Sequence, residues 1–293
     1  MPPVAIVVNR LRTGDLGRFR RRCGAVAEAN GWQPWFLETS EDDRGAELAR
    51  DAVAAGARLV FAVGGDGTVR ACAQALAGTG IPLAIVPRGT ANLAARALGL
   101  PFGLDAALAT GFGGRDRQVD LAVADGMPFA AMAGMGLDAA VVAATPDAIK
   151  SRLGWLAYPA AGMVRLAGRS HEFEVSLDDG QPLTRRARCV VVGNAGLLPG
   201  GFVLLPGARL DDGLLDVGIL APSNLLGWGR VAYRVLTRAS RNDRPLERHT
   251  ARRVEIRAHT ELPREVDGEV ICPGRSLTIT LRPGALLARV PSQ

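Results

Sequence analysis

Lysine is almost absent from this sequence, and its absence excludes one common kind of nucleotide site. Of the 35 lysine and arginine residues, only Lys150 is a lysine. No G-x-x-x-x-G-K-[ST] run is present, so the chain has no P-loop lysine. Aromatic residues make up only 5%, and they do not alternate with basic residues as they do on surfaces that stack bases. The sequence therefore predicts no nucleic-acid partner.

Long apolar runs and closely spaced cysteines are also missing. The best candidate for a membrane span, 121–144, is broken by Asp125 and Asp138, and the N-terminus has no charged-then-apolar leader. These features predict a cytoplasmic protein. The cysteines lie far apart without metal-binding spacing, and three of the four lie in apolar patterns, which predicts buried free thiols. They are Cys23, Cys72, Cys189 and Cys272.

Apolar material and positive charge are abundant. The chain has 293 residues, 48% of them hydrophobic, enough for one large or two ordinary domains with their own cores. The net charge of +6 favours anionic partners such as nucleotides or phospholipid surfaces.

The N-terminal part of the chain alternates strand and helix patterns at short spacing. Such alternation is typical of a parallel sheet covered by helices, in which ligands bind where strands end and helices begin. The predicted strands are 4–8, 32–37, 59–63 and 82–86, and the predicted helices are 16–30, 45–55, a helix that follows residue 68, and 93–98.

Near Asp120 the pattern changes to short strands bounded by turns, with a hairpin signal at Asp178-Asp-Gly180. We predict an α/β fold with an N-terminal parallel-sheet nucleotide domain, 1–119, and an antiparallel β-sandwich-like domain, 120–293. Return of the last strand to the first domain stays open. The predicted strands are 119–124, 129–133, 173–177, 188–192, 215–220, 254–258 and 277–281.

Two helical patterns, 151–168 and 225–240, interrupt these strands. Each mixes large apolar residues with arginines. Both could rest on an anionic membrane surface or line an apolar pocket. The alternative for each is a helix packed on the β domain with its arginines in water.

A glycine turn, Gly64-Gly-Asp-Gly-Thr68, joins an apolar strand pattern to a helical one. Its glycines let backbone N–H groups approach an anion, and the helix start adds partial positive charge. Asp66 would repel a bare phosphate, so we expect it to hold a metal ion that bridges phosphates or to accept a proton. Thr68 either caps the helix or donates to a phosphate oxygen. The turn therefore predicts a phosphate site, although an ordinary tight turn is the alternative.

A second turn, Pro87-Arg-Gly-Thr-Ala-Asn92, opens the next helix. Thr90 could donate to a phosphate or cap the helix, and Asn92 could orient a substrate hydroxyl or a loop carbonyl. Asn9, Thr39, the glycine turn and Thr90 all fall at strand ends. This coincidence predicts one shared nucleotide site.

The two turns together resemble the diacylglycerol kinase catalytic family, which includes bacterial lipid kinases, sphingosine kinases and ceramide kinases. Gly-Gly-Asp-Gly alone is shared with NAD kinases and phosphofructokinases, but the resemblance continues over nearly the whole chain. The further matching motifs are 132–139, Gly193-Asn194 before Gly200-Gly201, 205–216 and 266–269.

The resemblance implies that ATP phosphorylates a lipid hydroxyl, with Mg²⁺, in a cleft between the two domains. For magnesium it implies Asp212 as a side-chain ligand, backbone carbonyls of Arg209 and Leu214, and Asp216 as a supporting carboxylate. The alternative is that Asp211-Asp-Gly213 is only a turn, or that the ion only braces the second domain. The residues predicted to bind ATP are Asn9, Arg10, Thr39, Gly64, Gly65, Asp66, Gly67, Thr68, Val69, Arg70, Thr90 and Asn92.

Asp267 and Glu269 are the predicted catalytic carboxylates, together with Asp66 on the metal–phosphate side. In the family, the Asp-Gly-Glu step supplies the base toward the substrate hydroxyl. The sequence does not choose between Asp267 and Glu269, and a plain hairpin turn at Asp267-Gly268 is the alternative.

Two departures from the family pattern affect substrate and phosphate contacts. The first loop reads Asn9-Arg-Leu-Arg-Thr-Gly14, where many members carry proline and serine after the asparagine, and we expect Arg10 and Arg12 to contact phosphate instead. Leu93 stands where many diacylglycerol kinases have aspartate, so a sphingoid-like alcohol is as suitable a substrate as diacylglycerol.

The sequence thus predicts a cytoplasmic lipid kinase, peripheral to the inner face of the membrane, with transient contact to an anionic surface. A homodimer stays open. The rival hypotheses are a soluble-metabolite kinase of the NAD kinase type and a non-catalytic nucleotide- or lipid-binding module.

Overall fold

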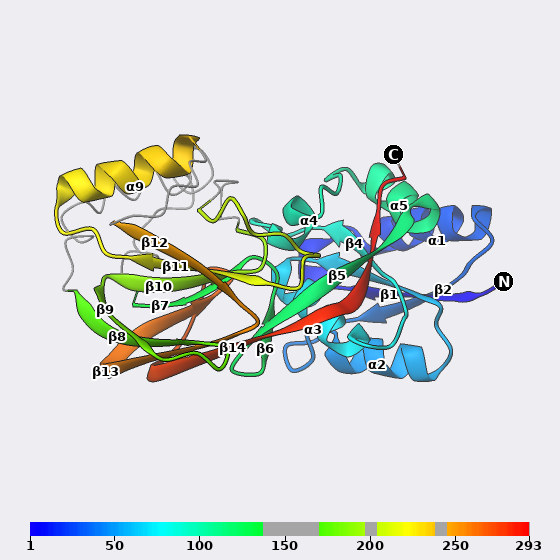
Figure 1. Cartoon of the computed structure of the whole chain (residues 1–293). Coiled ribbons are helices and arrows are strands. Elements are labelled where there is room, and N and C mark those ends of the chain that lie inside the picture. Colours follow the sequence, from blue (N-terminus) through cyan, green and yellow to red (C-terminus); the bar gives the residue numbers. More distant parts are fainter. Residues whose placement is uncertain (137–169, 197–203, 238–244, 293) are drawn as a thin grey trace. The chain divides into compact units, whose positions relative to one another are not determined.

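The computed structural model describes residues 1–136, 170–196, 204–237 and 245–292. The chain forms two compact units (Figure 1). The first comprises Met1–Leu121 and Gly284–Gln293, and the second comprises Ala122–Pro283. Among the described residues, no helix is long and apolar enough to cross a membrane.

The first unit is built on a parallel sheet. Its strands run in the order β2-β1-β3-β4, and the C-terminal end of β14 (Glu269–Val290) pairs in parallel with β4 at Ala288. The strands are β1 (Pro3–Val8), β2 (Gln33–Glu38), β3 (Leu59–Gly64) and β4 (Leu83–Pro87). The helices are η1 (Arg10–Arg12), α1 (Leu16–Ala29), α2 (Ala46–Ala54), α3 (Asp66–Leu76), α4 (Leu93–Ala97) and α5 (Leu104–Gly113).

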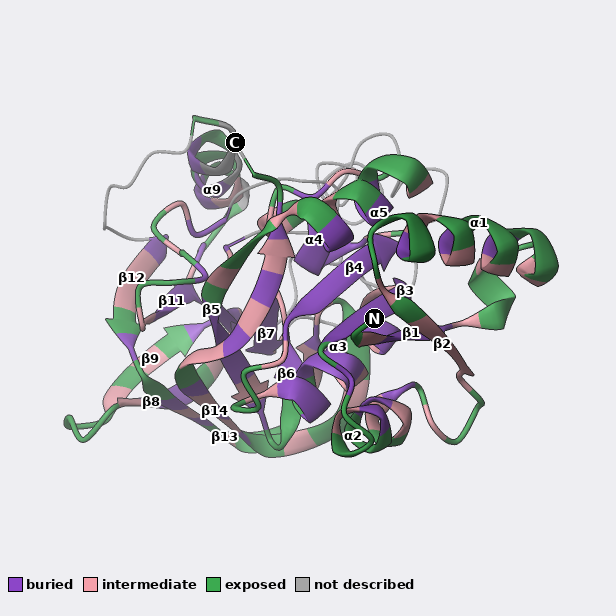
Figure 2. Cartoon of the chain, turned by 90° about the vertical axis from the view of Figure 1, so that its right-hand side faces the viewer, coloured by how far each residue is buried: buried purple, intermediate pink, exposed green. Residues whose placement is uncertain are grey.

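Helices cover both faces of this sheet, which is buried along its central strands (Figure 2). On one face α1 and α5 pack against β1 and β3, where the Phe61 and Phe112 rings lie 4.7 Å apart. On the other face α2 and α3 pack together. The parallel α/β arrangement predicted from the alternating pattern is therefore confirmed.

Helix α5 was not predicted, because its sequence has no clear polar face. Alanine, leucine, glycine and phenylalanine occur around most of its circumference, so the 3.6-residue period is weak. Gly111 is required there by packing, since a Cβ atom would lie 2.2 Å from the Phe61 ring.

The second unit is dominated by antiparallel strands, as predicted for a β-sandwich-like domain. The main order is β12-β11-β10-β7-β13-β14, and the first part of β13 also pairs with β8, which pairs with β9. Strand β5 (Arg115–Ala124) begins in the first unit and ends in the second. The other strands of the second unit are β6 (Met127–Phe129), β7 (Met132–Met135), β8 (His171–Leu177), β9 (Leu183–Ala187), β10 (Cys189–Gly193), β11 (Leu215–Leu220), β12 (Leu246–Ala251) and β13 (Arg253–Val266). One helix, α9 (Leu225–Thr237), is described in this unit.

Some sequence expectations for this unit are corrected. The expected strand 129–133 is two strands, β6 and β7, separated at Ala130-Ala131. Strands β9 and β12 were missed because they are mostly polar, and β13 and β14 run far beyond 254–258 and 277–281 because one side of each is exposed. The expected helix 225–240 is present as α9 through Thr237. The expected helix 151–168 lies outside the described residues.

Aspartates hold the turns of the second unit. The predicted hairpin at Asp178 joins β8 to β9, and the Asp178 carboxylate accepts hydrogen bonds from the N–H groups of Arg252 and Arg253, both at 2.8 Å. Asp178 and Asp267 have left-handed φ angles of 51° and 50°. Aspartate tolerates this conformation better than most residues because its short side chain bonds locally. Three of the four cysteines are buried, as the apolar patterns predicted: they are Cys23, Cys72 and Cys189, while Cys272 is exposed.

Candidate active site

Two glycine turns of the first unit lie in direct contact. Strands β3 and β4 pair in parallel with Gly64 opposite Pro87, so the turns that follow them emerge side by side. A Cβ atom added to Gly89 would lie 2.6 Å from Cα of Gly65, and one added to Gly64 would lie 2.5 Å from Oγ1 of Thr68. These glycines are thus needed for packing as well as for any approach of a ligand to the backbone.

Asp66 joins the two turns by a hydrogen bond. Its Oδ1 accepts from the backbone N–H of Leu93 at 2.6 Å, at the start of α4. Asn92 shapes the second turn, because its side chain accepts from the N–H of Gly89 at 2.8 Å and donates to the Gly89 carbonyl at 2.7 Å. Of the roles considered for Asn92, the structure shows the contact with a loop carbonyl.

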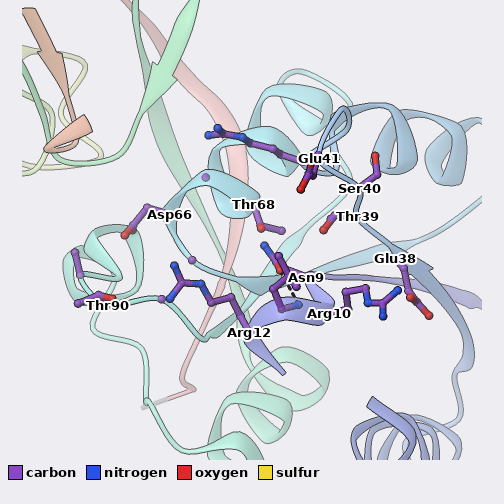
Figure 3. Close-up of a pocket in the computed structure, with 16 residues that line it drawn as sticks. Asn9, Arg10, Arg12, Glu38, Thr39, Ser40, Glu41, Asp66, Thr68 and Thr90 are labelled. Atoms are coloured by element: carbon purple, nitrogen blue, oxygen red, sulfur yellow. Dashed lines mark hydrogen bonds between the residues drawn. The ribbon is translucent and has the colours of Figure 1, made fainter. Parts of the chain in front are cut away.

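A cleft of about 860 Å³ opens beside these turns (Figure 3). Side chains reach it from the loop after β1, the end of β2, the start of α3 and the loop before α4. Its size is within the range of cofactor pockets. The residues that line it are Asn9, Arg10, Leu11, Arg12, Glu38, Thr39, Ser40, Glu41, Arg44, Gly65, Asp66, Gly67, Thr68, Gly89, Thr90 and Ala91.

The cleft offers the groups that a polyphosphate requires. Three arginines line it, and neither Arg10 nor Arg12 has an ion-pair partner among the described residues. Helix α3 begins at Asp66, so N–H groups of its first turn are available to an anion. Glu38 is held at the rim by an ion pair with Arg20 at 2.7 Å. This end of the sheet can therefore bind a phosphorylated ligand.

Most of the predicted nucleotide-site residues lie in this one cleft, and four do not line it. Gly64 ends β3, Asn92 is buried within its turn, and Val69 and Arg70 are buried in α3. Several lining residues were not named from the sequence. Gly89 and Ala91 belong to the second turn, of which only Thr90 and Asn92 were named, and the others were indicated only by their position at a strand end or before α2. The lining residues not named are Leu11, Glu38, Ser40, Glu41, Arg44, Gly89 and Ala91.

Asp267 and Glu269 lie in the second unit and have different environments. Asp267 and Gly268 form the two-residue turn between β13 and β14, with Val266 paired to Glu269. The Asp267 carboxylate accepts hydrogen bonds from the N–H groups of Ala130 at 2.9 Å, Ala131 at 2.8 Å and Met132 at 3.2 Å. These bonds satisfy the backbone N–H groups at the break between β6 and β7.

Glu269 is exposed at the start of β14. Because Asp267 is part of the turn, the two carboxylates do not share one face of a strand, as residues two apart on a regular strand would. The Asp267 carboxylate thus binds backbone N–H groups, and Glu269 is the more solvent-accessible of the two carboxylates.

A third carboxylate, Glu265, lies close to this turn on β13. Burial, together with repulsion from Asp267, raises the pKa of Glu265 to about 7, while a bond from the Gly268 backbone opposes the shift. Glu265 was not identified from the sequence, since nothing in its neighbours indicates that it is desolvated.

The predicted magnesium loop brings two carboxylates close together. Burial and repulsion from Asp212 raise the pKa of Asp216 to about 6, although Arg248 opposes the shift. Asp212 itself accepts a hydrogen bond from the N–H of Leu214 at 3.1 Å. Two carboxylates that repel each other suit a divalent cation with oxygen ligands. Among the described residues, no group of three or more His, Cys, Asp or Glu side chains is arranged to hold a metal ion. Any ion at this loop would therefore need backbone carbonyls as well.

The fold and the cleft define the class of protein, and comparisons with known proteins agree. Residues 3–124 match the diacylglycerol kinase catalytic domain, and residues 131–289 match the "YegS C-terminal NAD kinase beta sandwich-like domain". The chain is 36% identical over 266 residues to a "probable lipid kinase YegS-like" of Pseudomonas fluorescens, covering 90% of this chain and 87% of that protein. The chain belongs to the YegS-like lipid kinase family.

Solved structures extend this comparison. A "putative diacylglycerol kinase" from Bacillus anthracis matches with a TM-score of 0.81 and 25% identity, over 98% of this chain and 95% of that one. An NAD kinase from Archaeoglobus fulgidus, solved in complex with ATP, matches with a TM-score of 0.52 and 12% identity, over 98% of this chain and 93% of that one. At that identity the NAD kinase likeness shows a related fold alone.

Proposed function

We propose that this protein is an ATP-dependent lipid kinase that transfers the γ-phosphate to a hydroxyl of a diacylglycerol- or sphingoid-like lipid. The observation that carries the proposal is the cleft at the two glycine turns, joined by Asp66, in a chain of a lipid kinase family. In this proposal the domain 1–119 binds ATP and the domain 120–293 binds the lipid.

The cleft residues have separate tasks in binding ATP. The backbone of Gly65 and Gly67 and the hydroxyls of Thr68 and Thr90 contact phosphate oxygens, and Arg10 and Arg12 balance their charge. The Oδ1 atom of Asp66 accepts the hydrogen bond from the Leu93 N–H, so its Oδ2 atom would bind a magnesium ion that also contacts the phosphates. Phosphoryl transfer depends mainly on such positioning and charge neutralisation.

We assign the proton transfer to Glu269. Asp267 accepts three backbone hydrogen bonds, so both of its oxygens are engaged in holding the chain between β6 and β7. Glu269 is exposed and can reach a lipid hydroxyl without loss of those bonds. A base of this kind contributes on the order of 10²–10⁴-fold to the rate.

A second magnesium ion would bind at the loop of the second unit. Asp212 and Asp216 would supply carboxylate oxygens, and Arg209 and Leu214 would supply backbone carbonyls. An ion there would relieve the repulsion that raises the pKa of Asp216. It would brace the loop, and the Mg²⁺ on the phosphates would neutralise charge during transfer.

Leu93 bears on the choice of lipid. Its side chain is buried, and its backbone N–H is bonded to Asp66, so no second carboxylate stands at the start of α4. A sphingoid-like alcohol is therefore included beside diacylglycerol. The kinase would work in the cytoplasm and touch the anionic inner face of the membrane only transiently.

The test is incubation with γ-labelled ATP, Mg²⁺ and a fractionated lipid extract, followed by identification of the labelled lipid. We expect label in the organic phase, and none when EDTA removes the metal. Label found only in NADP, when NAD is supplied, would favour the NAD kinase alternative and contradict the proposal. No transfer to any acceptor would favour the binding-module alternative.

A further inference from the structure

Helix α9 presents two chemically distinct faces. Gly227, Val231 and Arg234, spaced four and three residues apart, are buried against the second unit. Leu226, Arg230 and Tyr233 repeat the same spacing one position earlier and form an exposed stripe, which we call the outer face of α9. In Figure 1 the helix lies beside β11 and β12, and β12 is the edge strand of the sheet.

The outer face is apolar and cationic, with no acidic residue. The exposed fractions of Leu226 and Tyr233 are 77% and 65%, which makes both exceptions among the large hydrophobic residues of the described chain. The whole helix, Leu225–Thr237, contains arginines but no aspartate or glutamate. A face of this composition suits the boundary between lipid headgroups and acyl chains.

A cavity of about 750 Å³ adjoins the start of this face. Leu226, Arg230 and Arg186 all line it. Arg185 also lines it, but it is neutralised by Glu247 at 2.8 Å. Arg186 and Arg230 are exposed, and neither has an ion-pair partner among the residues that the structure describes. Two uncompensated guanidinium groups beside one cavity attract phosphate groups.

We propose that the outer face of α9 and this cavity dock the protein on an anionic phospholipid bilayer. Leu226 and Tyr233 enter the headgroup–acyl boundary, and Arg186 and Arg230 bind lipid phosphates. The proposal rests on the proposed lipid kinase function, because docking would bring the enzyme to a substrate that does not leave the bilayer. It also explains why apolar side chains remain exposed on a helix whose other face is well packed.

Vesicle sedimentation tests the docking surface. The probes are vesicles of phosphatidylglycerol mixed with phosphatidylcholine, and vesicles of phosphatidylcholine alone. We expect the wild-type protein to partition to the anionic vesicles in a salt-sensitive way. Each arginine near the surface multiplies the partition coefficient about fivefold. Arg186→Gln with Arg230→Gln should therefore reduce binding to anionic vesicles about 10- to 30-fold. Leu226→Ser with Tyr233→Ser should reduce binding at least about tenfold.

The matched control removes the same charge elsewhere. Arg58→Gln with Arg275→Gln changes two exposed arginines outside the outer face and the cavity, and should reduce binding less than threefold. Equal losses in the control and in the Arg186/Arg230 variant would overturn the proposal, as would wild-type binding by both the Arg186/Arg230 and the Leu226/Tyr233 variants. Circular dichroism and thermal unfolding verify that each variant is folded. If the Arg186/Arg230 variant does not fold, Arg186→Gln alone replaces it in the assay.

A kinase assay separates this proposal from the function on which it rests. With the lipid extract dispersed in nonionic detergent micelles, the Arg186/Arg230 and Leu226/Tyr233 variants should phosphorylate lipid at the wild-type rate, since no bilayer is needed. Inactive wild-type protein that still binds anionic vesicles through α9 would contradict the kinase function and support the docking surface. Active wild-type protein without α9-dependent binding would support the kinase function and contradict the docking surface.

Discussion

The carboxylate of Asp66 accepts a hydrogen bond from the backbone N–H of Leu93 at 2.6 Å. This bond ties the start of α3 to the start of α4, and so joins the two turns that border the cleft. One carboxylate oxygen of Asp66 therefore stabilises the two turns. In the proposed function, the other oxygen binds magnesium.

Substitution of Asp66 can separate these two tasks. Asp66→Asn keeps an oxygen that can accept from Leu93, so it should cost less than about 1 kcal/mol of unfolding free energy. Asp66→Ala loses the bond and should cost about 1–2 kcal/mol. Both should reduce phosphorylation at least about 100-fold, because both remove the charge that would hold magnesium. Urea unfolding and the lipid phosphorylation assay measure the two effects, and wild-type activity of Asp66→Asn would contradict the magnesium role.

The contact between the glycine turns predicts a steric cost. Gly89→Ala would place its Cβ 2.6 Å from Cα of Gly65 and 2.9 Å from Oδ1 of Asn92. It should lower the unfolding free energy by about 1–3 kcal/mol and weaken ATP binding, because the turns must separate. Gly24→Ala is the matched control: nothing lies within 4 Å of that Cβ, so alanine in α1 should stabilise by about 0.5–1 kcal/mol. An unfolding free energy of Gly89→Ala equal to that of Gly24→Ala would contradict the close contact between the two turns.

The environments of Asp267 and Glu269 predict opposite behaviour on substitution. Asp267→Asn replaces an acceptor of three backbone bonds and should destabilise the fold by about 1–3 kcal/mol. Glu269→Gln keeps one acceptor oxygen on an exposed side chain, so we expect it to cost less stability than Asp267→Asn while it reduces phosphorylation on the order of 10²–10⁴-fold. Unfolding curves and single-turnover rates distinguish them. A fully active Glu269→Gln enzyme would return the role of base to Asp267.

Glu265 predicts how stability depends on pH. Its pKa is raised from an unfolded value of about 4.3 to about 7, so the folded state holds the proton more tightly. The stability that it contributes is fully present below about pH 4.3 and is lost as the pH rises through about 7. Glu265→Gln should thus match wild type near pH 4.5 and be more stable at pH 8.5, on the order of 1–3 kcal/mol. The exposed Glu174, changed to Gln, should show no such difference, and equal curves for Glu265→Gln and wild type would contradict the prediction.

The fold and most of the cleft could be predicted from the sequence because the signals are local. Strand ends marked by Asn9, Thr39 and Thr90 meet at one edge of a parallel sheet, as the alternating pattern requires. The bond from Asp66 to Leu93 joins residues far apart in the chain, and it depends on the register that sets Gly64 opposite Pro87.

The environments of the carboxylates in the second unit could not be predicted from the sequence either. Asp267-Gly268 was recognisable as a hairpin signal, but its bonds to Ala130 and Ala131 are set by the pairing of β13 with β7. The raised pKa of Glu265 depends on burial by distant elements. Nothing local in the sequence encodes these tertiary contacts.

The most direct test of the central claim compares two labels in ATP. Wild-type protein is incubated with Mg²⁺, the lipid extract and ATP labelled at either the γ- or the α-phosphate, and the organic phase is counted. A lipid kinase with the proposed cleft should transfer the γ-label to lipid and leave the α-label in water, and Asp66→Asn should reduce the transfer at least about 100-fold. Absence of γ-label from the organic phase, with every lipid fraction tested, would contradict the account.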